Sequence, residues 1–149
     1  MKRLLIVITG FALGGAVTAG VGMTGTKNEA HAAKAPARAT VMIQHQLHGC
    51  HAWSVNGGAF KAAQRTTLAR GGTIKFVDND VMPHTLVQTR GPKVTYVGHR
   101  AMRRMGASVS ARFSQAGVYR FTTKVGEDYM PGVKTIGEDN VLRLVVTVA

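Results

Sequence analysis

Beyond residue 39 the chain alternates short apolar and polar runs with turn-forming residues. In residues 40–47, Val41, Ile43 and Leu47 fall on one face, which is the two-residue period of a half-buried β-strand. Similar runs predict strands at 66–68, 73–77, 85–88, 94–97, 108–113, 118–122 and 141–148. No long segment of this part has a helical period. We therefore expect an all-β domain, an antiparallel Greek-key sandwich or barrel of about eight strands.

Residues 1–32 have the composition of an export signal. Lys2 and Arg3 precede an apolar stretch over residues 4–23, and an Ala-x-Ala cleavage pattern ends at Ala32. We expect cleavage near Ala32 and export to the periplasm, the cell surface or the medium. An uncleaved N-terminal membrane anchor is the alternative, because the stretch is about long enough to span a bilayer. The predicted organisation is a signal peptide over 1–32, a short tether over 33–39 and one domain over 40–149.

The chain is strongly basic, with a formal net charge of +12. Without residues 1–32 it keeps 16 Lys and Arg against six Asp and Glu, a charge of +10. Nucleic acid is excluded as a partner, because an exported chain rarely meets it and no nucleic-acid motif is present. The charge is either a solvated face or a surface for an acidic redox partner protein or an anionic cell envelope. The residues of this basic face are Arg90, Lys93, Arg100, Arg103 and Arg104.

The single cysteine, Cys50, lies in a histidine-rich run that contains His45, His48 and His51. One cysteine cannot form an internal disulfide, and a free exposed thiol would oxidise in an exported protein. Cys50 is therefore either a buried core residue or a metal ligand. Three imidazoles within five residues favour the metal ligand. Zinc would also accept this mixture of donors.

Two segments further along the chain resemble the small cupredoxins. Residues 67–87 contain a strand, a Gly turn and an Asn-Asp pair that lead to Pro-His at His84, and residues 113–121 resemble the strand that leads to the family's Cys-His-Met loop. The resemblance implies a copper-binding β-sandwich. It also implies that His84 is a copper ligand and that Met130 is the weak axial ligand.

The usual copper thiolate of that family is missing. Its cysteine position is occupied by Thr123, and its second histidine position by Gly126. A threonine hydroxyl stays protonated at neutral pH and cannot replace a thiolate. Alternate loops of a Greek-key sandwich gather at one end, so the loop that carries Cys50 can reach His84 and Met130. We therefore expect a relocated mononuclear copper site with Cys50 as its thiolate.

The second imidazole of this site is either His51 or His48. In an extended chain His48 and Cys50 would share a face, whereas a turn at Gly49 would re-aim His51 toward the site. The turn is favoured, which makes His51 the expected ligand and His48 the alternative.

The predicted function is one-electron transfer by an exported copper protein. Storage, delivery or resistance without electron transfer is the first alternative, with copper or zinc bound. A metal-free β-sandwich that serves as an interaction module is the second. Nothing in the sequence marks an oxyanion hole or a nucleophile with its base, so we predict neither an enzyme nor a small-molecule substrate. The sequence does not determine the oligomeric state.

Overall fold

The computed structural model describes residues 34–126, 136–138 and 140–149, and every regular element among them is a β-strand. None of the described residues belongs to a helix that is long and apolar enough to cross a membrane. The strands are β1 (Arg38–His45), β2 (His51–Val55), β3 (Ala63–Leu68), β4 (Thr73–Asn79), β5 (His84–Arg90), β6 (Thr95–Val97), β7 (Ala101–Met102), β8 (Ser108–Arg112), β9 (Gly117–Val125) and β10 (Arg143–Val148).

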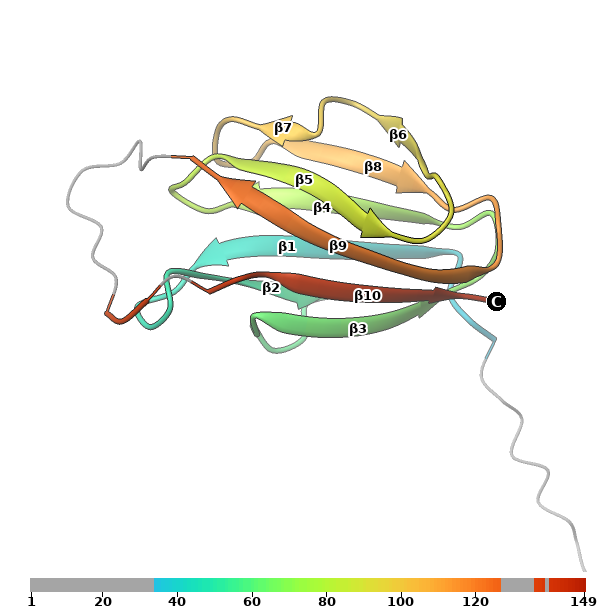
Figure 1. Cartoon of the computed structure of the whole chain (residues 1–149), viewed down its shortest axis with the longest axis horizontal. Coiled ribbons are helices and arrows are strands. Elements are labelled where there is room, and N and C mark those ends of the chain that lie inside the picture. Colours follow the sequence, from blue (N-terminus) through green and yellow to red (C-terminus); the bar gives the residue numbers. More distant parts are fainter. Residues whose placement is uncertain (1–33, 127–135, 139) are drawn as a thin grey trace, which may run out of the picture. The chain divides into compact units, whose positions relative to one another are not determined.

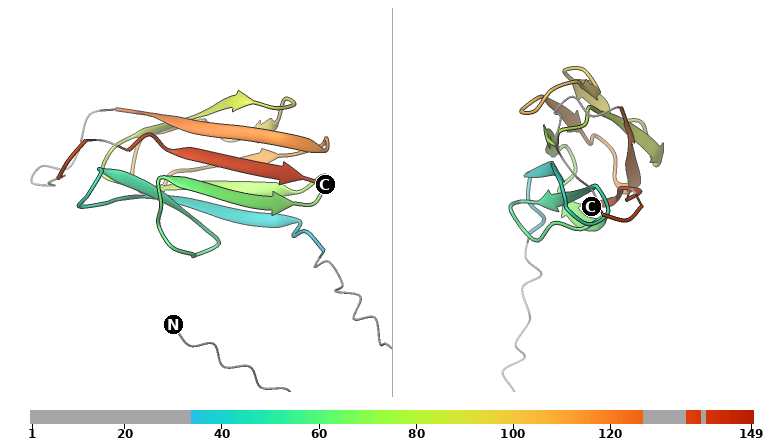
Figure 2. Two further views of the ribbon diagram at one scale, coloured as in Figure 1. Left: turned by 60° about the horizontal axis from the view of Figure 1, so that its bottom comes forward. Right: turned by 90° about the vertical axis from the view of Figure 1, so that its left-hand side faces the viewer.

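The strands form two five-stranded sheets that pack face to face, in the orders β2-β1-β4-β8-β6 and β3-β10-β9-β5-β7 (Figure 1). The chain crosses repeatedly between the sheets, and Figure 2 shows the two layers from the side and from one end. The all-β prediction is confirmed for the described residues. The Greek-key description of the connections stays a prediction.

The expectation of purely antiparallel sheets is wrong, because both sheets are mixed. β1 runs parallel to β4, and β3 runs parallel to β10. After the β1–β2 hairpin the chain crosses to the second sheet as β3 and returns to the first as β4. It therefore arrives beside β1 in the same direction. A strand pattern fixes which residues face the core, but it does not fix the direction of a neighbouring strand.

The core between the sheets comes from the predicted alternation. Val41 and Ile43 of β1 and Phe76 of β4 are fully buried on one side, and Phe121 of β9 meets them from the other. The rings of Phe76 and Phe121 lie 5.6 Å apart between centroids. Trp53 of β2 is also fully buried, and its indole N–H donates to backbone carbonyls of Ala62 and of β10.

The described part of the chain forms ten strands where about eight were expected. The additional strands are β2 and β7. β2 has no alternation because four of its five residues are buried, and Trp53 pairs with Lys61 through an isolated antiparallel bridge. β7 has only two residues, too few for a period. β1 begins at Arg38, so Arg38 and Ala39 of the predicted tether belong to the first sheet. The predicted signal segment lies outside the described residues.

The first test concerns the buried indole of Trp53. Phenylalanine at this position keeps most of the apolar burial but removes the donor to the carbonyls of Ala62 and Arg143, at 3.2 Å each. We expect Trp53→Phe to lower the free energy of unfolding by about 1–3 kcal/mol, measured by urea denaturation followed by circular dichroism. Val118→Ala, at a 47% exposed position of β9, is the control and should change it by less than about 0.5 kcal/mol. Equal effects would contradict a structural role for the indole N–H.

Candidate metal centre

Three segments far apart in the sequence meet at one end of the sandwich. They are the turn between β1 and β2, the turn between β4 and β5, and residues 136–138 and 140–142, which precede β10. The first and third are linked by backbone hydrogen bonds between Leu47, Gly49 and Ile136. The second meets β9 where His84 pairs with Val125. The expectation that these loops share an end is confirmed for their described residues.

Two histidines and an aspartate form a buried cluster at this end. His51 at the start of β2, Asp80 in the β4–β5 turn and His84 at the start of β5 each place one potential ligand atom within 4.8 Å of the others. Asp80 and His84 are fully buried, and His51 is 2% exposed. Nε2 of His84 lies 3.4 Å from a carboxylate oxygen of Asp80, and the two imidazole rings meet edge to face at 5.0 Å. Buried groups of this kind are either well paired or metal-bound.

A second buried aspartate, Asp78, holds the β4–β5 turn in shape. One of its oxygens accepts the backbone N–H of Asp80 at 3.0 Å, and the other accepts that of His84 at 3.2 Å. Asp80 in turn accepts the N–H of Met82 at 3.0 Å. Asp78 therefore aligns both ends of the turn, and with them the side chains that enter the cluster.

The two carboxyl groups differ in acidity. Burial raises the pKa of Asp78 to about 6, although its two backbone hydrogen bonds and the nearby His84 act in the opposite direction. Burial also acts to raise the pKa of Asp80, but the His84 side chain, the N–H of Met82 and the charges of His84 and His45 outweigh it and hold this pKa below its usual value. Nδ1 of His45 lies 3.5 Å from Asp80. The Asp80 carboxylate thus faces imidazoles on two sides and favours its ionised form, which is the form that binds metals.

Thr123, at the family's cysteine position, contacts the other nitrogen of His84. Its Oγ1 lies 3.1 Å from Nδ1 of that ring. A histidine that binds a metal through one nitrogen is usually oriented by a hydrogen bond at the other. Thr123 is therefore placed to orient the His84 imidazole. At the family's second histidine position, a Cβ on Gly126 would lie 2.6 Å from the Pro83 ring, so this fold leaves no room for a side chain there.

Cys50 sits in a tight turn that aims it into the protein. Gly49 and Cys50 have φ angles of 76° and 59°, and the left-handed conformation is uncommon for a residue such as cysteine. The turn is closed by Gln46 N–H donating to the Cys50 carbonyl at 2.5 Å, and the Asn140 side chain donates to the carbonyl of His51. The thiol is fully buried, with its sulfur 3.4 Å from the Met82 sulfur.

The predicted site residues are thus only partly brought together. His51 and His84 share the cluster, whereas His48 is exposed and pairs through its backbone with Ile136. Cys50 lies next to His51 in the chain and contacts Met82, but it is not a member of the three-residue cluster. Met130 lies outside the described residues.

Sequence reasoning missed Asp80 and Asp78. The sequence analysis gives Asp78 no role in the site and includes Asp80 only in the Asn-Asp pair that precedes Pro-His. A signal was nevertheless present, since two acids flank Asn79 just before the Pro-His pair in a chain that is otherwise strongly basic. Acidic residues that are scarce and adjacent to a candidate histidine are candidates for metal ligands.

Comparison with known proteins gives no family assignment. No family model matches the sequence, and a search of curated proteins finds no match. Among solved structures, an oxidized methionine-to-lysine mutant of amicyanin is 16% identical to this chain, with a TM-score of 0.38. The match covers 74% of this chain and 82% of the amicyanin chain. The cysteine protease inhibitor EhICP2 from Entamoeba histolytica is 9% identical, with a TM-score of 0.35. This match covers 72% of the present chain and 97% of the inhibitor. Likenesses this distant carry no argument about function.

The second test concerns Asp78, which should act on the site without binding the metal. Asp78→Ala leaves two buried N–H groups without an acceptor, and Asp78→Asn leaves one, because an amide has a single oxygen. We expect the alanine variant to lose about 2–5 kcal/mol of unfolding free energy and the asparagine variant about half of that. Urea denaturation measures both. Equal stability of the two variants and the parent would contradict the role of Asp78 in holding the turn.

Proposed function

We propose that this protein is an exported, cupredoxin-like copper-binding protein that transfers single electrons. The observation that carries the proposal is the pair of buried imidazoles, His51 and His84, that meet across the two sheets beside the only thiol of the chain. These are two of the residues expected at a relocated copper site. The cupredoxin-type motifs around His84 add support from the sequence.

The donor atoms at this end of the sandwich suit copper better than the harder divalent ions. Imidazole and sulfur ligands select copper or zinc, whereas magnesium and calcium require oxygen ligands. The described donors are two imidazoles, one carboxylate, and the sulfurs of Cys50 and Met82. Copper bound here would supply a one-electron couple. We propose His51, His84 and Cys50 as its ligands, with Met130 as the axial thioether.

The chain's own residues contribute rigidity and exclusion of water. Asp78 fixes the backbone around His84, and Thr123 fixes its ring. The turn at Gly49 fixes the backbone on either side of Cys50, and the Asn140 side chain fixes that of His51. A site whose ligands cannot rearrange favours rapid electron transfer, because oxidation and reduction then need little movement. We further propose that the protein is not an enzyme and that it exchanges electrons with an acidic partner protein.

The position of Asp80 in the cluster favours a second candidate function. A site of two imidazoles and a carboxylate also suits zinc, or copper held for storage or delivery without electron flow. In that case Cys50 would be a buried neighbour with no bond to the metal. The two candidates differ in one observable property, the thiolate-to-copper absorption.

The third test separates these candidates by spectroscopy. We expect added Cu(II) to give an intense visible absorption band, which Cys50→Ser removes because the serine hydroxyl stays protonated. His84→Ala and His51→Ala should abolish tight copper binding, measured by competition with a chelator. His48→Ala is the matched control, since this exposed histidine should leave both band and affinity intact. Colourless copper binding that survives Cys50→Ser but not Asp80→Asn would establish the storage or zinc-type site instead.

The fourth test concerns Thr123. Thr123→Val keeps the shape of the side chain but removes the hydroxyl at 3.1 Å from His84 Nδ1. We expect copper affinity to fall by about 10–100-fold, which is typical when a group that orients a ligand is removed. Thr122→Val, at the neighbouring residue of β9, is the control. Unchanged affinity in Thr123→Val would show that His84 needs no support from β9.

A further inference from the structure

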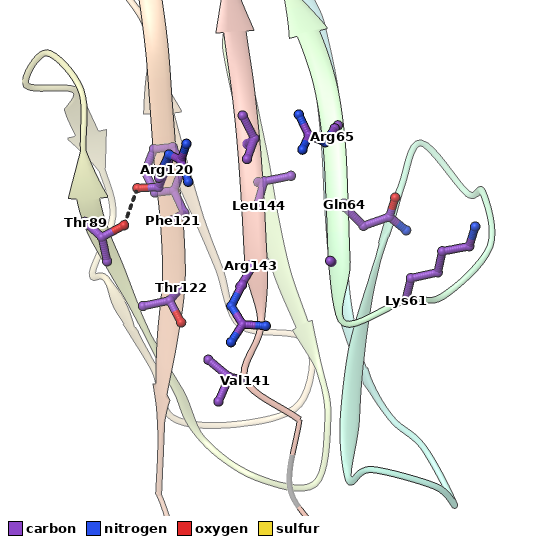
Figure 3. A pocket seen from close by; sticks show the side chains of 12 residues that line it. Lys61, Gln64, Arg65, Thr89, Arg120, Phe121, Thr122, Val141, Arg143 and Leu144 are labelled. Atoms are coloured by element: carbon purple, nitrogen blue, oxygen red, sulfur yellow. Dashed lines mark hydrogen bonds between the residues drawn. The ribbon is translucent and has the colours of Figure 1, made fainter.

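The second sheet carries a hollow on its outer face that contains none of the metal-site residues. Its volume is about 740 Å³, and it lies over β10 between β3 and β9 (Figure 3). Cations from three strands and from the segment before β3 surround it, namely Arg65, Arg120, Arg143 and Lys61. The other lining residues are Ala63, Gln64, Thr89, Phe121, Thr122, Val141, Leu144 and Val145.

Strand register explains why the three arginines gather here. Val145 of β10 pairs with Arg65 of β3 on one side and with Arg120 of β9 on the other. Neighbouring strands are about 4.8 Å apart, so these two arginines start about 10 Å from each other across Val145. Arg143 lies two residues earlier on β10, on the same face, at a rise of about 7 Å. The three side chains thus start from the corners of a small triangle.

No negative charge compensates these cations within the described part of the chain. The acids there are Asp78 and Asp80, which are fully buried at the metal centre, and Glu138, which does not line the hollow. Both ion pairs among the described residues join a histidine to Asp80, so none involves a lysine or an arginine. Within the described ranges, no acidic side chain forms an ion pair with Arg65, Arg120 or Arg143.

We propose that this hollow binds a compact polyanion that carries at least two phosphate or carboxylate groups. Arginine presents a planar fork of donors that matches both kinds of oxyanion, and three forks around one hollow can each take a separate group. A volume of about 740 Å³ is that of a small-molecule site. A flat membrane surface would not fill it, and a single monoanion would engage only part of it. The site is independent of copper.

Titration calorimetry with tripolyphosphate and with citrate, in about 0.1 M salt and without added metal, tests the proposal. We expect one ligand per protein chain, with acetate binding far more weakly. The triple variant Arg65→Gln, Arg120→Gln, Arg143→Gln should weaken binding at least about tenfold, because it removes three charge-assisted donors. All three positions are exposed, so folding should persist, as circular dichroism will show.

A matched triple variant separates a site from a general effect of net charge. Arg103→Gln, Arg104→Gln, Arg112→Gln removes the same charge from exposed positions outside the hollow. It should change affinity less than about threefold, since distant exposed charges are screened. Equal losses in the two triple variants, or no binding of either polyanion at millimolar concentration, would overturn the proposal. A preference for tripolyphosphate identifies a phosphate-bearing ligand, and one for citrate a polycarboxylate. His84→Ala should bind the polyanion normally, which keeps this result separate from the copper proposal.

Discussion

The candidate site depends on one buried carboxylate, that of Asp78 at the end of β4. It accepts the N–H groups of Asp80 and His84, and so closes a turn whose two ends both contribute a side chain to the cluster with His51. A buried acid is costly to hold charged, which is why its pKa rises to about 6. The cost is offset by hydrogen bonds to two donors that would otherwise be buried without acceptors. The turn, the orientation of His84 and the position of Asp80 all follow from this arrangement.

On the opposite side of the site, the turn between β1 and β2 is held by its backbone geometry. Gly49 and Cys50 both adopt left-handed angles, and a side chain at Gly49 would collide with Asn140, which holds the chain at His51. Strained residues of this kind persist where the surrounding structure determines them, and they cluster at functional sites. The β4–β5 turn thus relies on hydrogen bonds to Asp78, and the β1–β2 turn relies on its constrained backbone. The two imidazoles of the cluster meet between these two turns, and the Cys50 thiol lies against Met82.

Charge is segregated in the described part of the chain. Two of its acids are buried at the candidate metal centre, while cations occupy the outer surfaces, including the hollow over β10. The basic residues are therefore not spread evenly over the surface, because strand register gathers three arginines around Val145. A positive field of this kind attracts anions from a distance, and the concave shape then selects among them by size.

The sequence alone determined the strands with a clear alternation and the core residues on them, because a period of two reports directly which face is buried. It also predicted His84, through a motif, and His51, through its unusual neighbours, and both lie in the buried cluster with Asp80. The role of Cys50 stays a prediction. It could not show β2, which is buried on both faces, or the parallel pairs, which depend on how the chain crosses between sheets. Only the tertiary structure showed that Asp80 lies close to His51 and His84 and that Thr123 contacts the His84 ring. It also showed that arginines from three strands surround one hollow. Those contacts join residues far apart in the chain, and local pattern carries no information about such pairs.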